Sequence, residues 1–207
     1  DVVGEEIQEN AGVGLTLNDT DVHSADGDST KISYHIPAVG GLTAGVSFTD
    51  AGTDDTSATQ DITGYGAQYA MEAGGASITL GAATMTQDTT TAQDTDSSNY
   101  GVKIVSGDLT FILATAEYEA VGQDEESTGA GASMKISDGL SAAVFSYKVE
   151  DDGTSEEYTN SGVEVAYTIA SGLTAYVNVE DYEYKAGTSG GTADSGTASK
   201  LTIKATF

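Results

Sequence analysis

The last eight residues of the chain, Lys200-Leu201-Thr202-Ile203-Lys204-Ala205-Thr206-Phe207, alternate between polar and apolar side chains. Successive side chains of a β-strand point to opposite faces, so the apolar residues would share one face and the Lys and Thr residues the other. This pattern is typical of a strand that has lipid on one face and water on the other. A terminal aromatic residue also suits the aromatic girdle at a membrane surface.

The composition narrows the class of protein. The chain has 207 residues, with 7 Lys and no Arg against 33 Asp and Glu, and a formal net charge of −26. Such a charge repels nucleic acid, so we expect no nucleic-acid partner. No apolar run reaches the roughly 18 to 20 residues of a transmembrane helix. Abundant Gly, Thr, Val and Tyr favour strands and turns, and we predict an all-β fold.

Glycine-containing turns recur along the chain. Their glycines, Gly41, Gly75, Gly107, Gly139 and Gly172, follow one another at spacings of 32 to 34 residues. Such tight turns join antiparallel neighbours. Between them lie segments rich in Asp, Thr, Ser and Gly, which we interpret as long loops: 50–61, 87–98, 120–128, 150–160 and 185–197. Short turns at one end and long loops at the other are the layout of an outer-membrane β-barrel.

This layout predicts eleven antiparallel strands after residue 29. In one direction we expect strands at 30–37, 62–71, 99–105, 129–136, 161–169 and 198–207. In the other direction we expect strands at 42–49, 76–86, 109–118, 140–149 and 173–184. The strand 140–149 is ambiguous, because Leu140, Ala142 and Val144 favour one face and Phe145 and Tyr147 the other. A β-bulge there would reconcile the two patterns.

The parity of each strand separates a lipid face from a polar face. The predicted lipid face carries apolar residues in every strand with clean alternation, and it places Tyr34, Tyr69, Tyr167 and Phe207 near the turns, where an aromatic girdle lies. The opposite face would line a pore. Its predicted basic residues are Lys31, His35, Lys103, Lys135, Lys200 and Lys204, and its predicted acidic residues are Glu164 and Glu180. A lysine facing lipid at mid-membrane costs about 2–4 kcal/mol, which supports this assignment.

The remaining acids cluster in the expected long loops, for example Asp54-Asp55, Asp124-Glu125-Glu126 and Glu150-Asp151-Asp152. We interpret them as solvated loop residues and expect no cofactor. Calcium binding by clustered carboxylates is the alternative interpretation. No other metal site is expected, since the chain has no Cys and only two His.

One hairpin resembles a known family. In the porins, a strand ending in Tyr-x-x-Pro turns through Gly into a strand that ends in an aromatic residue. The chain resembles this pattern at Ser29-Thr30-Lys31-Ile32-Ser33-Tyr34-His35-Ile36-Pro37, followed by residues 40–48. This hairpin and the terminal Phe207 are the two features in which the chain resembles the Gram-negative general diffusion porins. The resemblance implies a trimeric, sixteen-stranded outer-membrane barrel of which this chain supplies the sixth to the sixteenth strand.

The resemblance also assigns the segment 1–29. In that family the loop before the sixth strand folds into the barrel and narrows the pore. The acids of this segment, which would then form the constriction loop, are Glu5, Glu6, Glu9, Asp19, Asp21, Asp26 and Asp28. The family's arginine cluster has no counterpart here. The chain starts at Asp1 without an initiator Met or a signal peptide, so we expect a mature or truncated form that lacks the first five strands.

These observations predict a water-filled channel for passive diffusion of small hydrophilic solutes and ions. The expected partners are outer-membrane lipid, lipopolysaccharide and two further copies of the chain, in a Gram-negative bacterium. We expect a preference for cations that Lys135→Glu strengthens.

One alternative is a complete twelve-stranded barrel, with Gly12–Asn18 as an additional strand. Another is a soluble acidic β-protein. An enzyme is not expected, because His23 and His35 accompany no nucleophile motif.

Overall fold

The structure is a computed structural model that describes residues 30–50, 59–89, 94–188 and 190–206. The described chain is all-β, as predicted, and forms eleven strands. The first six are β1 (Thr30–His35), β2 (Leu42–Asp50), β3 (Thr59–Ala73), β4 (Ala76–Thr89), β5 (Thr95–Ser106) and β6 (Leu109–Ala120). The others are β7 (Gln123–Ser137), β8 (Leu140–Asp151), β9 (Glu156–Ala170), β10 (Leu173–Lys185) and β11 (Asp194–Ala205).

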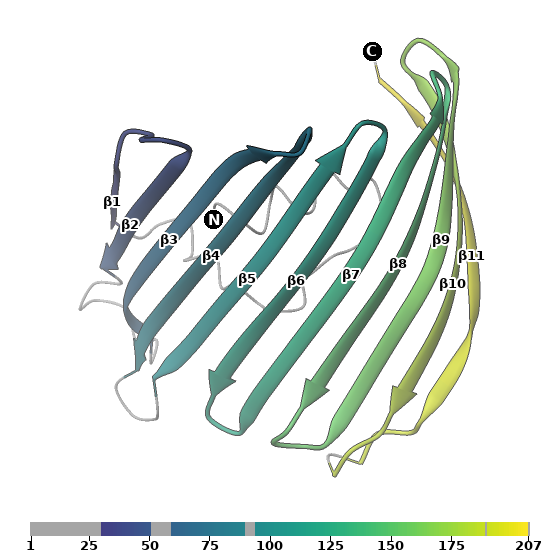
Figure 1. Cartoon of the computed structure of the whole chain (residues 1–207). Helices are drawn as coiled ribbons and strands as arrows, with labels where there is room; N and C mark the ends of the chain where they lie inside the picture. The colour runs from purple at the N-terminus through teal and green to yellow at the C-terminus, as the bar shows by residue number, and fades with distance from the viewer. Residues whose placement is uncertain (1–29, 51–58, 90–93, 189, 207) are drawn as a thin grey trace.

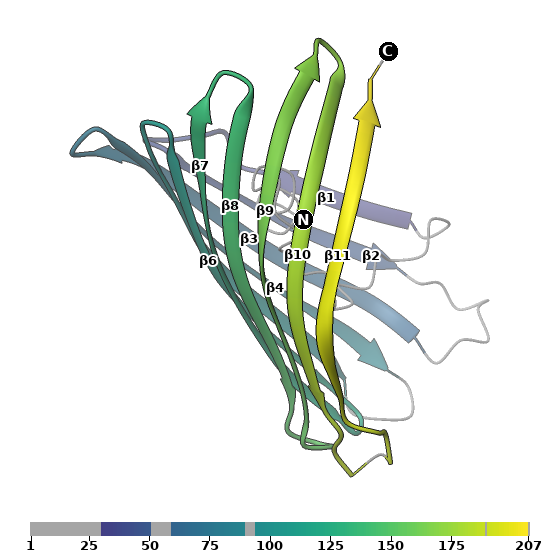
Figure 2. The same ribbon diagram turned by 90° about the vertical axis from the view of Figure 1, so that its right-hand side faces the viewer.

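The strands form one antiparallel sheet in chain order, from β1 to β11. Figures 1 and 2 show that this sheet is strongly curved, like part of the wall of a cylinder. In the described part of the chain, β1 and β11 each pair with a single neighbour and form the two edges of the sheet. An open edge presents unpaired backbone N–H and C=O groups, so both edges can accept a further strand.

Tight turns join the strands at one end, which is at the top of Figure 1 and which we call the turn end. Between β3 and β4, for example, Gly74 and Gly75 have φ angles of 61° and 83°. Two consecutive positive φ angles are the requirement of a type I′ hairpin turn, and glycine meets it without strain. The glycine spacing in the sequence therefore located the turn end correctly.

The opposite end, which we call the loop end, differs from the prediction. The expected loop 120–128 is a two-residue turn, because β6 ends at Ala120 and β7 begins at Gln123. The expected loop 150–160 likewise shrinks to residues 152–155. The acids Asp124-Glu125-Glu126 and Glu150-Asp151 thus lie in strands. The polar side chains of these segments do not end the backbone pairing, which continues from strand to strand up to the turns.

Exposed and less exposed side chains alternate along the central part of the sheet, most clearly in β6, β8 and β10. In β6 the side chains of Phe111 and Leu113 are 46% and 51% exposed, whereas those of Ile112 and Ala114 are 5% and 4% exposed. Side chains crowd on the concave side of a curved sheet and spread apart on the convex side. We therefore call the buried set the inner face and the exposed set the outer face. Exposed large apolar side chains in this number are expected only where another apolar medium covers them.

The outer face carries a continuous apolar band over its turn half. Cross-strand partners such as Leu80 and Val102, Val102 and Leu113, and Val163 and Val179 lie directly opposite one another in this band. Tyr34, Tyr69 and Tyr167 are exposed on the outer face near the turns, where the girdle was predicted. Phe207 lies outside the described residues.

The ambiguous strand 140–149 contains no bulge in the structure. Residues of β8 pair with β9 without interruption from Leu140 to Asp151, and the only irregularity with β7 falls beside the turn, between Lys135 and Ser137, in the described ladder. Phe145 and Tyr147 instead point to the inner face. They oppose glycines, Phe145 facing Gly131 and Gly162 and Tyr147 facing Gly129, so the inner face has room for their rings.

Candidate functional site

The inner face collects the residues that the sequence assigned to a pore wall. The ladder places His35 opposite Gly45, Lys103 opposite Thr79 and Lys135 opposite Ser141. It places Lys200 and Lys204 opposite Asn178 and Thr174. Glu164 and Glu180 share this face, and the backbone position of Lys31 lies in an inner row opposite Thr49. The predicted faces are therefore those of the structure, although the basic residues are spread over several strands and form no cluster.

Two of the predicted basic residues have close neighbours. The Nζ atom of Lys135 lies 2.9 Å from Oδ1 of Asp138, which sits in the turn before β8. The imidazole of His35 lies so close to Gly45 that a Cβ there would be 2.8 Å from Nδ1. Lys135 is thus partly neutralised by its own turn, and His35 covers a backbone segment of β2.

Glu180 is held on the inner face by two side-chain amides. Asn178 donates a hydrogen bond of 2.6 Å from Nδ2 to Oε1 of Glu180, and Asn160 donates one of 3.1 Å from Nδ2 to Oε2. Glu164 lies in the adjacent row, directly opposite Asn178. Both amides turn their donors toward Glu180, so this carboxylate is fixed on the wall as a charge-assisted acceptor.

Sequence reasoning missed the tyrosines of the inner face. Tyr176, Tyr182 and Tyr184 of β10 have the same parity as Glu180, and Tyr158 of β9 lies directly opposite Tyr184. The parity of β10 was a sufficient signal to find three of them. Their position next to the acids of β9, however, depends on the register of the pair.

The described residues form at least two hollows on the inner face. The larger one, of about 610 Å³, lies at the turn end over β6–β10, and its lining includes Lys135, Glu164 and Tyr176. The smaller one, of about 290 Å³, lies at the loop end, and its lining includes Glu156 and Tyr184. Each hollow thus has a carboxylate and a tyrosine in its wall.

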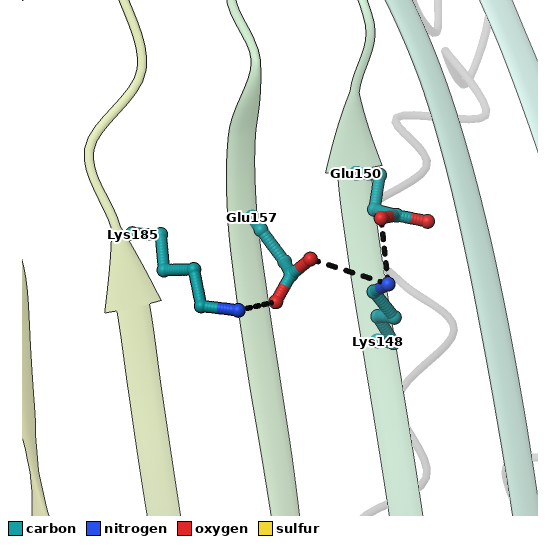
Figure 3. A network of polar contacts seen from close by, with 4 residues as sticks. All are labelled: Lys148, Glu150, Glu157 and Lys185. Carbon is teal, nitrogen blue, oxygen red and sulfur yellow. Dashed lines mark hydrogen bonds and ion pairs between the residues drawn. The ribbon is translucent and has the colours of Figure 1, made fainter.

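A second charged region lies on the outer face at the loop end, beyond the apolar band. Figure 3 shows its four residues on three adjacent strands: Lys148 and Glu150 of β8, Glu157 of β9 and Lys185 of β10. The Nζ atom of Lys148 lies 2.6 Å from Oε1 of Glu150 and 3.2 Å from Oε2 of Glu157, and Lys185 donates a hydrogen bond to Oε1 of Glu157. The hydrogen bonds from Lys185 and then Lys148 lower the pKa of Glu157 below its ordinary value.

This network lies at one end of a row of like charges. Glu117 of β6 opposes Glu126 of β7, which opposes Glu150, which in turn opposes Glu157. Like charges that directly face each other across strands are destabilising. Lys148 and Lys185 offset that repulsion on β8–β10, where the sequence had suggested only solvated loops.

Several predicted residues lie outside the described ranges. They are the constriction-loop acids Glu5, Glu6, Glu9, Asp19, Asp21, Asp26 and Asp28, the additional strand Gly12–Asn18, and His23. Within the described residues, no group of three or more His, Cys, Asp or Glu side chains is arranged to hold a metal ion. The same residues include no helix that is long and apolar enough to cross a membrane.

Comparisons with known proteins agree with this geometry. The family model described as Gram-negative porin matches residues 2–187. An anion-selective porin from Comamonas acidovorans is 18% identical, with a TM-score of 0.65 over 86% of this chain and 59% of that one. A refined porin structure is 16% identical, with a TM-score of 0.68 over 90% and 64% of the two chains. OccAB4 of Acinetobacter baumannii is also 16% identical, with a TM-score of 0.64 over 86% and 52%.

At these identities the likeness establishes the fold. The chain spans between about half and two-thirds of the length of these three structures. No curated protein sequence matches the chain.

Proposed function

The chain belongs to the Gram-negative porin family of the outer membrane, and on that premise we propose that its strands form part of the wall of a water-filled channel. Small hydrophilic solutes and ions would cross by passive diffusion along the inner face. No catalytic step is assigned to the chain. Homotrimer formation and contact with lipopolysaccharide are parts of the same proposal, and they rest on the family resemblance.

One observation supports the proposal: adjacent residues of β9 lie on an apolar and a polar face of the sheet. Val165 is 42% exposed on the outer face within the apolar band, and its neighbour Glu164 lines the larger hollow on the inner face. A carboxylate at the level of the apolar band is tolerable only where water reaches it. An aqueous space on one side of the sheet and hydrocarbon on the other define the wall of a pore.

The proposal further states that the channel prefers cations. The net charge of −26 and the acids on both faces of the loop end raise the local concentration of cations at the mouth. The preference should be strongest at low salt, because at physiological salt charges more than about 8 Å apart are screened.

The test is electrical. The whole protein to which these strands belong is purified and reconstituted in a planar lipid bilayer, and single-channel steps and the reversal potential are measured in a KCl gradient. Discrete steps with a reversal potential that indicates cation preference are expected. A protein that inserts but conducts no ions would overturn the channel function, and a strong anion preference would overturn the selectivity.

A further inference from the structure

The pairing of β9 with β10 joins acids and tyrosines of the inner face into one stripe. We define the acid–tyrosine stripe as Glu156 and Glu164 of β9 with Tyr176, Glu180, Tyr182 and Tyr184 of β10. The ladder places Tyr182 opposite Asn160, Glu180 opposite Gly162, and Tyr176 opposite Ala166. Three of the large side chains of β10 thus have small or amide partners on β9, whereas Tyr184 lies opposite Tyr158.

The stripe runs along the wall between the two hollows. Tyr184 and Tyr176 are eight residues apart on β10, which corresponds to about 27 Å along a strand. Glu156 and Tyr184 line the hollow at the loop end, and Glu164 and Tyr176 line the hollow at the turn end. Glu180 and Tyr182 lie between them. A solute that follows this wall therefore meets a carboxylate and a tyrosine ring in each hollow, and a third carboxylate and ring between the two hollows.

The charged inner-face residues of β9 and β10 have one sign. The inner-face positions of β9 and β10 hold three carboxylates and no lysine, within the described residues of these strands. The nearest inner-face lysines are Lys200 and Lys204 on the adjacent strand β11, opposite Asn178 and Thr174, and Lys135 of β7, which is paired with Asp138. Glu164 has neither an ion pair nor a hydrogen bond within the described structure. A cation that enters the turn-end hollow finds an uncompensated carboxylate there.

Carboxylates combined with tyrosine rings are suited to organic cations. An ammonium group gains Coulomb energy from the carboxylate, and an alkylated ammonium is also attracted to the face of an aromatic ring. A strongly hydrated inorganic cation gains less from the rings, because it keeps its water. We propose that the acid–tyrosine stripe is a track that favours small alkylammonium ions over potassium. The proposal rests on the channel function proposed above and names one class of solute for it.

The experiment uses the whole protein in a planar bilayer with tetramethylammonium chloride on one side and KCl on the other. The reversal potential gives the permeability of tetramethylammonium relative to potassium. Tyr176→Leu and Tyr182→Leu should each lower this ratio about two- to fivefold, which is the size of one exposed cation–π contact. Glu164→Gln should lower the permeability of both cations relative to chloride. Tyr182→Phe, which keeps the ring, should preserve the ratio.

Matched controls lie on the outer face. Tyr100→Leu removes a ring and Glu126→Gln removes a charge, and both residues are exposed away from the inner face. Neither substitution should change the ratio. A conductance step in KCl shows that a variant has folded and inserted. If Tyr182→Leu forms no channel, the permeability ratio of Tyr176→Leu alone tests the role of the rings. Tyr176 and Tyr182 variants with the wild-type ratio would overturn the track while leaving the channel intact, whereas a wild-type protein without conductance would overturn the channel itself.

Discussion

The ring of Phe145 occupies the space that a side chain at Gly162 would need. A Cβ on Gly162 would lie 2.8 Å from Cζ of Phe145 and 2.7 Å from the carbonyl oxygen of Val179. One of these neighbours is backbone and cannot rotate away. The glycine is therefore required by the close approach of the ring and of β10, and it explains how an aromatic residue fits on the crowded inner face.

Gly162→Ala should destabilise the sheet by about 1–3 kcal/mol, the usual cost of overpacking a filled site. Gly66→Ala is the matched control, because a Cβ on Gly66, also an inner-face strand glycine, would meet its nearest atom at 3.8 Å. The free energy of unfolding in urea, measured in lipid vesicles, should fall only for Gly162→Ala. Equal stabilities of the two variants would contradict the packing described here.

Val165→Lys should cost about 2–4 kcal/mol, because it places an ammonium group in the apolar band. Ala166→Lys changes the next residue, whose side chain lines the larger hollow of the inner face, and should cost much less. The same unfolding measurement compares the two variants. Equal costs would mean that the two faces of β9 do not meet different media.

The contribution of Glu157 to stability should depend on pH. Its pKa is lowered from the ordinary 4.5 by Lys185 and Lys148, so the folded state holds the carboxylate ionised more strongly than the unfolded state does. That stabilisation is present above pH 4.5 and is lost as the pH falls through the lowered folded-state pKa.

Glu157→Gln should therefore be less stable than the wild type at neutral pH, and the difference should shrink in strong acid and in high salt. Glu183→Gln is the control. Glu183 lies on the outer face of the neighbouring strand β10 and takes part in none of the ion pairs of Figure 3. The measurement is the free energy of unfolding as a function of pH. A difference that stays constant into strong acid would exclude the ion-pair explanation.

Lys135→Glu should increase the preference of the channel for cations. The substitution replaces the positive charge in the larger hollow and leaves Asp138 and Glu164 there without it. Lys148→Gln removes a lysine of the outer face, away from the hollows of the inner face, and should change the selectivity much less. Reversal potentials in a KCl gradient at low salt compare the two variants, and an unchanged Lys135→Glu channel would show that this hollow lies off the ion path.

The sequence by itself determined the faces of the strands and the positions of the turns. Both depend on local properties. The two-residue period of a strand assigned Lys200 and Lys204 to one face and Leu201 and Ile203 to the other. The positive φ angles of the tight turns require residues such as Gly74 and Gly75. The loop end was predicted less well, because polar residues such as Glu125 and Glu126 do not reveal whether the backbone is still paired.

The tertiary structure alone decided which residues meet. The register between β9 and β10 sets Glu164 against Asn178 and Tyr158 against Tyr184, and the register between β8 and β9 brings Phe145 over Gly162. A strand shows its own alternation in its sequence, but its alignment with a neighbour depends on backbone hydrogen bonds between residues far apart in the chain. The inner-face hollows, the glutamate row and the lysines that offset it all follow from that alignment.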